Sequence, residues 1–372
     1  MQGEVKHVRS LYEAAKIYYQ SRGIAWFNLE AIDRVIGFLA ESSGFVSSSA
    51  VNAAGVLQGL RLARTGREAG YILKFLWHVG FLSCRYLRGR FEYRLNAAGH
   101  RYYRRRLQQG SEAALSQLYY AVTSRWAPLL KALEYLRAKG RASVRDIVRD
   151  LGGEMEYWTS IMSNFGFEVQ PVKKPYNEFV VRNLLIPLMQ EFGLIEARGR
   201  GYELTEQARH VLEKARKDYD VVRTRPQEPL IYAAICDMLL AREAILVSPW
   251  IDEATARSIV KGVLKGVGKY TELSELRVVT RRPDDKTRRA LRVLRELEDY
   301  VELEMGYLTR REVSLHAKIY LSERAATVTS ANLLQRSLWR NFEVGIYLPE
   351  TSTALQQVAE EVWQHAQPHR LI

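Results

Sequence analysis

Residues Leu315–Asn332 read LHAKIYLSERAATVTSAN, and their pattern decides how the C-terminal part of the chain folds. Polar and apolar side chains alternate over the first seven positions, as in a strand with one face against a core. His316, Lys318 and Tyr320 share the polar face. The apolar face, which we expect to be buried, comprises Leu315, Ala317, Ile319 and Leu321. A second strand follows and ends in TSAN, so that polar groups gather at one end of the pair.

A third strand brings a carboxylate to the same place. The segment NFEVGIYL, from residue 341, carries Glu343 and Gly345 on one face, while Ser330 and Asn332 end the strand before it. Lysine supplies positive charge for phosphate oxygens, and hydroxyl and amide groups donate hydrogen bonds. Histidine can attack phosphorus or transfer protons near neutral pH. A His-x-Lys triplet alone is usual in a partly solvated strand, but the converging groups predict a phosphodiester site.

The order of these residues resembles the signature of the phospholipase D superfamily, on three pairs: His316-x-Lys318, Ser330-x-Asn332 and Asn341-x-Glu343. The similarity covers about residues 225–372. It implies that His316 forms a covalent phosphohistidine, and that Lys318 and Asn332 hold the phosphate with support from Ser330. It also implies that Glu343 orients the histidine and that no metal or other cofactor takes part.

The sequence departs from that signature at two positions. Glu323 stands where the family has a supporting aspartate, and Thr329 stands where the family has the glycine before the serine. The spacer between them is about one residue shorter than in the family. We expect Glu323 to affect the geometry of the site more than its chemistry. We expect Thr329 to narrow the site, because glycine lets backbone approach a substrate closely.

The chain holds a single His-x-Lys motif, whereas the family's mechanism uses one histidine as nucleophile and another as general acid. A symmetric homodimer in which each chain contributes one His316 would supply both. We therefore expect two chains to pair through the C-terminal domain.

Strands alternate with helices from about residue 221 onward. AILVSPWI, from residue 244, is expected as a buried strand, and Asp252 is expected to cap the helix after it. This rhythm predicts an α/β domain over residues 221–372, with helices packed on a mixed sheet. The stretch 218–230 contains two prolines and marks the domain boundary.

Residues 1–220 contain a weak internal repeat. The segments HVGFLSCRYLRGRFEYRLNAAGHRYYRR and EFGLIEARGRGYELTEQARHVLEKAR each give a helix end, two strands joined at Arg-Gly, and another helix. Gly89 and Gly199 allow the positive φ of a tight hairpin. Asn96 and Thr205 are the expected N-caps of the helices that follow.

Amphipathic helical patterns precede both hairpins, and residues 1–50 are predicted to be helical. Three helices and a two-stranded wing resemble the winged helix-turn-helix family. We expect two such domains, over residues 1–110 and 111–220. The chain is thus predicted to be multidomain, with an α-rich winged-helix half before the α/β phospholipase-D-like domain.

Positive charge is concentrated before residue 221, where 33 Lys+Arg face 22 Asp+Glu, against 22 and 20 in residues 221–372. Between Arg61 and Arg106 there are twelve basic and two acidic residues, with aromatic side chains among them. A basic run can be a solvated face, but on a helix and wing it favours DNA-backbone contact. The predicted contact residues are Arg64, Arg67, Lys74, Arg85, Arg88, Arg90, Arg94, Arg104 and Arg105.

Composition limits the possible location and function of the protein. The sequence has no apolar run of membrane-spanning length and no apolar signal core, and its two cysteines are isolated, so a cytoplasmic protein without membrane contact is expected. A metal-independent, DNA-binding nuclease is the predicted function. The alternative is a winged-helix transcriptional regulator whose phospholipase-D-like domain does not catalyse. A lipid phosphodiesterase would leave the basic N-terminal half unexplained.

Overall fold

The computed structural model describes residues 6–21, 29–60, 68–215, 218–308 and 315–368. The chain divides into two compact units, each built from more than one segment. The first unit comprises Met1–Val8, Lys16–Glu156 and Val172–Arg216. The second comprises Arg9–Ala15, Tyr157–Pro171 and Lys217–Ile372. The division into three domains at residues 110 and 220 stays a prediction.

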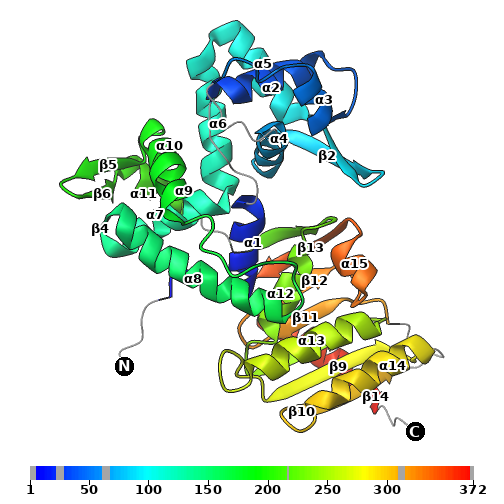
Figure 1. The fold of residues 1–372 in the computed structure, drawn as a ribbon. Helices are drawn as coiled ribbons and strands as arrows, with labels where there is room; N and C mark the ends of the chain where they lie inside the picture. Colours follow the sequence, from blue (N-terminus) through cyan, green and yellow to red (C-terminus); the bar gives the residue numbers. More distant parts are fainter. Residues whose placement is uncertain (1–5, 22–28, 61–67, 216–217, 309–314, 369–372) are drawn as a thin grey trace. The chain divides into compact units, whose positions relative to one another are not determined.

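The chain between Leu29 and Ala215 contains the same order of elements twice, which accounts for the sequence repeat (Figure 1). The first copy runs through α2 (Leu29–Glu41), β1 (Val46–Ser47), α3 (Ser48–Ala53), α4 (Glu68–His78), β2 (Leu82–Leu87), β3 (Arg90–Leu95) and α5 (Ala97–Gln109). The second runs through α7 (Ala127–Lys139), β4 (Arg141–Ala142), α8 (Val144–Asn164), α9 (Glu178–Val180), the π-helix η1 (Val181–Leu185), α10 (Ile186–Glu191), β5 (Ile195–Arg198), β6 (Gly201–Leu204) and α11 (Glu206–Ala215). The two sheets have equivalent strand orders, β1-β3-β2 and β4-β6-β5.

Local chemistry fixes both hairpins as expected. Gly89 and Gly199 have φ of 78° and 57°, and Asn96 caps α5 by accepting from the backbone N–H groups of Ala98 and Gly99. The Thr205 hydroxyl accepts from the N–H of Ala208 at 3.3 Å. The sequence did not predict the two-residue strands β1 and β4, because two residues carry no periodicity. Two further helices, α1 (Leu11–Ser21) and α6 (Ser111–Arg125), lie outside the repeat.

An eight-stranded mixed sheet forms the second unit, in the order β14-β10-β9-β8-β11-β12-β13-β7. Its strands are β7 (Asp220–Thr224), β8 (Glu243–Val247), β9 (Glu275–Arg281), β10 (Glu302–Leu308), β11 (Ile319–Ser322), β12 (Ala326–Thr329), β13 (Glu343–Leu348) and β14 (Gln367–Pro368). The β8, β9 and β10 strands are parallel to one another, and β11, β12, β13 and β7 continue antiparallel. The predicted mixed sheet is confirmed.

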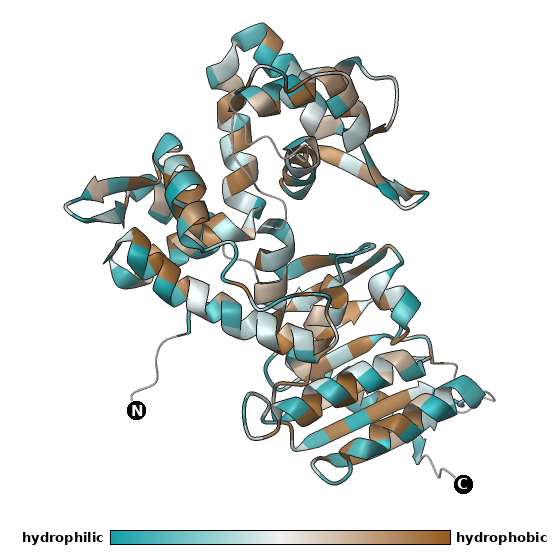
Figure 2. Ribbon diagram, viewed as in Figure 1, coloured by the Kyte–Doolittle hydropathy of each residue, from teal (hydrophilic) through white to brown (hydrophobic). Residues whose placement is uncertain are grey.

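Helices cover this sheet through apolar stripes, visible as brown and teal bands along α13 (Glu253–Gly266) and α14 (Asp285–Leu294) in Figure 2. Asp252 and Asp284 cap them through the N–H groups of Thr255 and Thr287. The unit also contains α12 (Leu230–Met238), η2 (Arg295–Leu297), α15 (Gln335–Trp339) and α16 (Thr353–Gln364). Ala359 of α16 belongs to one buried apolar cluster with Leu315, Ile319 and Leu321, and Ala317 packs against it. The predicted apolar face is therefore confirmed.

The first predicted strand of the motif is shorter than expected. β11 begins at Ile319, so His316 and Lys318 precede the strand in irregular backbone. Tyr320, predicted to share their face, is fully buried, and its hydroxyl donates to the carbonyl of Ala331 at 2.9 Å. In the part of the chain that the structure describes, no helix is long and apolar enough to cross a membrane.

Candidate functional site

Most of the predicted site residues lie at one end of the strands of the eight-stranded sheet. β8 ends at Val247 and pairs with Ile319 at the start of β11, while Thr329 at the end of β12 pairs with Gly345 of β13. This end of the sheet therefore contains the carboxyl ends of the parallel strands β8, β9 and β10. It also contains the two loop segments that carry the motif. Crevices at the carboxyl ends of strands are where open α/β sheets commonly bind ligands.

The centre of the cluster is the carboxylate of Glu343. Its Oε2 accepts a hydrogen bond from the Ser330 hydroxyl, and its Oε1 accepts one from Asn341 Nδ2 at 3.2 Å. The Ser330 Oγ in turn accepts from the N–H of Val344 at 3.2 Å, and the Ser330 N–H donates to the Val344 carbonyl at 2.9 Å. Ser330 and Asn341, near the two ends of the β12–β13 connection, and Glu343, at the start of β13, are thus held as one hydrogen-bonded group.

His316 is exposed, and Lys318 is partly buried beside it. The Lys318 ammonium donates to the backbone carbonyl of His316 at 2.6 Å. Within the residues described, the imidazole makes no hydrogen bond, and both Glu343 oxygens are already engaged by Ser330 and Asn341. The role of Glu343 in orienting the histidine stays a prediction.

Asn332 presents an unused acceptor near this group. Its Oδ1 is buried and has no hydrogen-bond partner among the described residues. Two buried side chains fix the backbone around it: Tyr320 donates to the Ala331 carbonyl, and the Ser248 hydroxyl accepts from the N–H of Leu333 at 3.1 Å. Burial, followed by the charge of Glu343, raises the pKa of Tyr320, which keeps it a hydrogen-bond donor.

The side chain of Thr329 packs against the neighbouring strand instead of projecting only toward the site. Its side chain lies against Gly345 on the neighbouring strand, where an added Cβ would sit 2.9 Å from the Thr329 Cβ. The Thr329 hydroxyl donates to the carbonyl of Val344 at 2.9 Å and accepts from the N–H of Ala331 at 3.2 Å. The glycine missing before the serine is therefore matched by a glycine across the ladder.

Glu323 lies at the opposite end of β11 from the other candidates. Its carboxylate accepts from the N–H groups of Arg242 and Glu243 at 2.9 and 3.0 Å, where β8 begins. The structure therefore does not bring Glu323 together with His316 or Glu343. Its two backbone hydrogen bonds instead connect the β11–β12 turn to β8.

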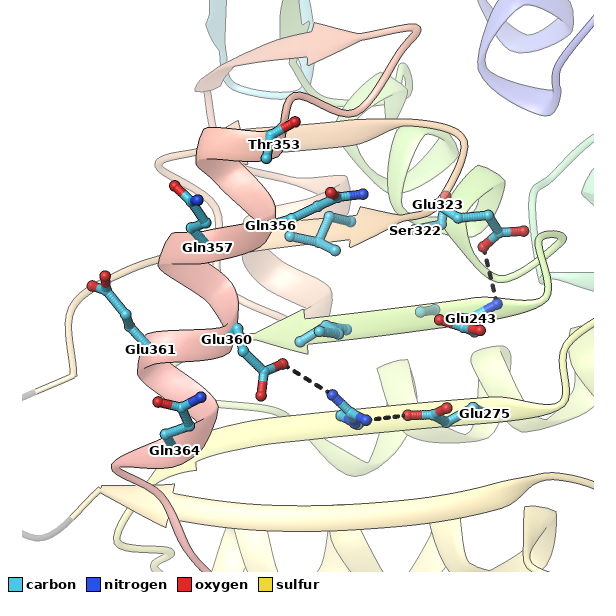
Figure 3. Close-up of a pocket in the computed structure, with 14 residues that line it drawn as sticks. Glu243, Glu275, Ser322, Glu323, Thr353, Gln356, Gln357, Glu360, Glu361 and Gln364 are labelled. Atoms are coloured by element: carbon cyan, nitrogen blue, oxygen red, sulfur yellow. Dashed lines mark hydrogen bonds and ion pairs between the residues drawn. The ribbon is translucent and has the colours of Figure 1, made fainter.

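A hollow of about 720 Å³ also lies at this opposite end of the strands, beside Glu323 (Figure 3). Five glutamates line it, including Glu243, Glu275 and Glu323, and its single cation, Arg277, is paired with Glu275 and Glu360 at 2.6 and 3.1 Å. Such a lining repels a phosphodiester, so the size of this hollow does not make it the phosphate site. Among the described residues, no group of three or more histidine, cysteine or acidic side chains could hold a metal ion.

The predicted DNA contacts that the structure describes lie on one hairpin and two helices of the first unit. Arg85, Arg88, Arg90 and Arg94 lie on the β2–β3 hairpin and are exposed. Arg85 pairs with Glu92 at 2.7 Å, and both Arg85 and Arg94 lie over the ring of Phe45. Lys74 lies on α4 and Arg104 and Arg105 lie on α5, whereas Arg64 and Arg67 fall outside the described residues.

Two residues at the site edge were missed by sequence reasoning. The guanidinium of Arg281 lies 4.2 Å from the ring centroid of Trp250. Each residue stands at or just beyond the carboxyl end of a parallel strand, β9 and β8 respectively. Position after a buried strand is the signal that could have identified them.

Comparison with known proteins gives partial structural similarities. No protein-family model matches the sequence, and no curated protein does either. The chain is similar to a phospholipase D family member, Nuc from Salmonella typhimurium (9% identity, 41% of this chain and 99% of that chain, TM-score 0.34). NucT from Helicobacter pylori is also similar (14% identity, 41% and 99%, TM-score 0.32). TrmBL2, described as an archaeal chromatin protein, has 12% identity over 63% and 91% of the chains, with TM-score 0.28.

Proposed function

We propose that this protein is a DNA-binding phosphodiesterase that cleaves through a phosphohistidine at His316 without a metal ion. The observation that carries the proposal is the hydrogen-bonded group of Ser330, Glu343 and Asn341, at the same sheet edge as His316 and Lys318. Preorganised donors and a cation around an exposed imidazole suit nucleophilic attack on phosphorus.

In this mechanism the His316 imidazole attacks phosphorus, a phosphorus–nitrogen bond forms, and the bond to the leaving oxygen breaks. A second imidazole protonates that oxygen. Water activated by the same base then attacks the phosphohistidine, which releases the phosphate product and restores the free His316. Lys318 and Asn332 stabilise the negative charge at phosphorus; Lys318 must first exchange its bond to the His316 carbonyl for the phosphate.

The second imidazole comes, in this proposal, from a second copy of the chain. Among the other histidines that the structure describes, none lies on β8, β11, β12 or β13 or on the turns at their site ends. An exposed apolar row crosses the last three strands of the same sheet, β12, β13 and β7: Val328, Ile346 and Val221 are paired in register and are 38%, 44% and 50% exposed. Val344, 53% exposed, continues the row to Ser330 and Glu343. A homodimer covering this row would bring a partner surface to the edge of the site.

DNA is the proposed substrate because the first unit carries exposed arginines without carboxylate partners. Among the described residues, Arg88, Arg90, Arg94 and Arg104 form no ion pair, so they remain free for backbone phosphates. Arg85 already pairs with Glu92, so it would have to exchange that partner for phosphate.

The test is incubation of wild type and His316→Ala with single- and double-stranded DNA in excess EDTA. We expect wild-type cleavage to persist in EDTA and the variant to lose at least about 10³-fold in rate, as for other removed nucleophiles. Equal cleavage by both proteins would contradict the proposal, as would a requirement for metal.

The transcriptional regulator is the second candidate, and the carboxylate geometry is the observation that favours it. Glu343 is bonded to Ser330 and Asn341 instead of the imidazole, so a histidine without an orienting group is present. A regulator would bind one DNA sequence in preference to others and cleave none, which the same DNA panel reveals.

A further inference from the structure

A second hollow, of about 400 Å³, adjoins the candidate site. It is lined by Gln335, Arg336, Arg340 and Asn341, with no acidic side chain among them. Both arginines are exposed, and within the described residues neither guanidinium forms an ion pair. Two unneutralised guanidiniums and two amides make a lining that attracts anions.

The backbone under this hollow is held in place by packing and hydrogen bonds. Ser337 and Leu338 of α15 are buried, and the ring of Trp339 lies 4.1 Å from that of Tyr232. The N–H groups of Arg340 and Asn341 both donate to the carbonyl of Arg336, at 3.0 and 2.9 Å. The two arginine side chains therefore project from a fixed turn.

Asn341 connects the hollow to the candidate site, because it lines the hollow and also donates to Glu343 at 3.2 Å. An acidic side chain also contacts the start of α15: the Asp252 Oδ2 accepts from the N–H of Gln335 at 2.7 Å. Its Oδ1 accepts from the N–H of Thr255, so both oxygens of Asp252 are occupied by backbone donors. Within the described residues, Asp252 forms no ion pair with Arg336 or Arg340, so both guanidiniums stay available to an anion.

We propose that this hollow holds a second phosphate of a DNA strand whose scissile phosphate lies at His316 and Lys318. Guanidinium groups bind phosphate oxygens bidentately, and two of them suit a doubly contacted phosphate or two successive ones. A molecule with one phosphodiester would leave the hollow empty, whereas a polynucleotide occupies both positions. The inference rests on the proposed function and makes it specific for a polymeric substrate.

The experiment measures binding of a fluorescent strand of eight thymidines as a function of salt, in the His316→Ala background so that no strand is cut. Arg336→Gln/Arg340→Gln is compared with Arg257→Gln/Arg324→Gln, which removes the same charge from arginines already paired with Glu253 and Glu272. We expect the slope of log K against log salt to become shallower by about 0.7 for each phosphate that is no longer bound, and only in the first pair. Equal slopes in the two pairs would overturn the inference.

A second measurement uses proteins with His316 intact and compares the thymidine strand with bis(4-nitrophenyl) phosphate, which has one phosphodiester. We expect the hollow variant to cut the strand at least tenfold more slowly and the small diester within twofold of wild type. Equal losses on both substrates would place the arginines at the scissile phosphate and overturn the inference. If wild type cuts neither substrate but the salt slopes differ, the proposed function fails and the phosphate subsite stands.

Discussion

Thr329 and Gly345 show how a departure from a family's pattern can be compensated by one neighbouring residue. The threonine side chain occupies the space over the glycine on the paired strand, and its hydroxyl makes two backbone hydrogen bonds. The sequence alone predicted a narrowed site, because nothing in one strand reveals which residue faces it in the next. Register supplies that information.

This pairing predicts the effect of adding a methyl group at Gly345. In Gly345→Ala the new Cβ meets the Thr329 Cβ and the Val328 carbonyl, each at 2.9 Å, so overpacking should destabilise the protein by about 1–3 kcal/mol. Adding Thr329→Gly should recover part of that loss. Thermal unfolding measures both, with Gly153→Ala as the control because its Cβ meets nothing within 4 Å. A Gly345→Ala protein as stable as wild type would contradict the packing.

At the scale of elements, the helices and strands of regular period were predictable and the short or buried ones were not. Alternation identified β11 and β13, a continuous apolar run identified β8, and Asp252 identified the start of α13. The buried helix α12 was missed because its own residues are apolar on nearly all faces, so its sequence has no helical alternation of polar and apolar residues. The sheet edge that gathers the site follows from strand order, which no local pattern contains.

The carboxylate of Asp237 helps to hold the first turn of α1, which belongs to the second unit. Asp237 accepts from the N–H of Leu11 at 2.8 Å and from the hydroxyl of Tyr347 at 2.7 Å. It thus caps the first turn of α1 from a helix distant in sequence. Burial raises the pKa of Asp237 to about 6, although these donors oppose the shift.

This raised pKa predicts a pH dependence with a definite sign. Between the ordinary aspartate pKa of 3.8 and about 6, the folded state holds the proton more tightly than the unfolded chain. The contribution of Asp237 to stability therefore falls as the pH rises through this window, by about 3 kcal/mol in total.

Urea unfolding at pH 4, 5, 6 and 7 tests this against Asp237→Asn, which cannot titrate. The wild type should lose stability relative to the variant as the pH rises from 4 to 7. Carboxylates with depressed pKa values, such as Asp150 at about 2, are present in both proteins and cancel in the difference. Parallel stability curves would show that Asp237 does not titrate in this window.

At the scale of the whole molecule, the proposed mechanism requires a second chain, and an exposed apolar row is a surface to which that chain could bind. The proposed mechanism needs two imidazoles at a site that has one, and the exposed apolar row of Val221, Val328 and Ile346 begins beside that site. Neither the row nor its exposure could be derived from the sequence, because the alternation of β13 is equally compatible with a strand covered on both faces.

A charge placed in the apolar row should separate the chains. Ile346→Lys puts an ammonium into the proposed dimer interface, where burying an unpaired charge is costly, while the exposed position tolerates it in the single chain. Sedimentation velocity should give a dimer for wild type and a monomer for Ile346→Lys. Tyr300→Lys, at a position 56% exposed before β10, is the control and should remain dimeric. A monomeric wild type with full activity would exclude a shared site.

A phosphohistidine at His316 can be trapped and detected on the protein itself. Wild-type protein is mixed with a DNA strand, quenched in alkali during turnover, and digested with trypsin, which releases the peptide EVSLHAK containing His316. If His316 is the nucleophile, mass spectrometry should find a nucleotide phosphate adduct on this peptide, formed in EDTA and absent from His316→Ala. Cleavage of the strand without any adduct on His316, or an adduct on another residue, would contradict it.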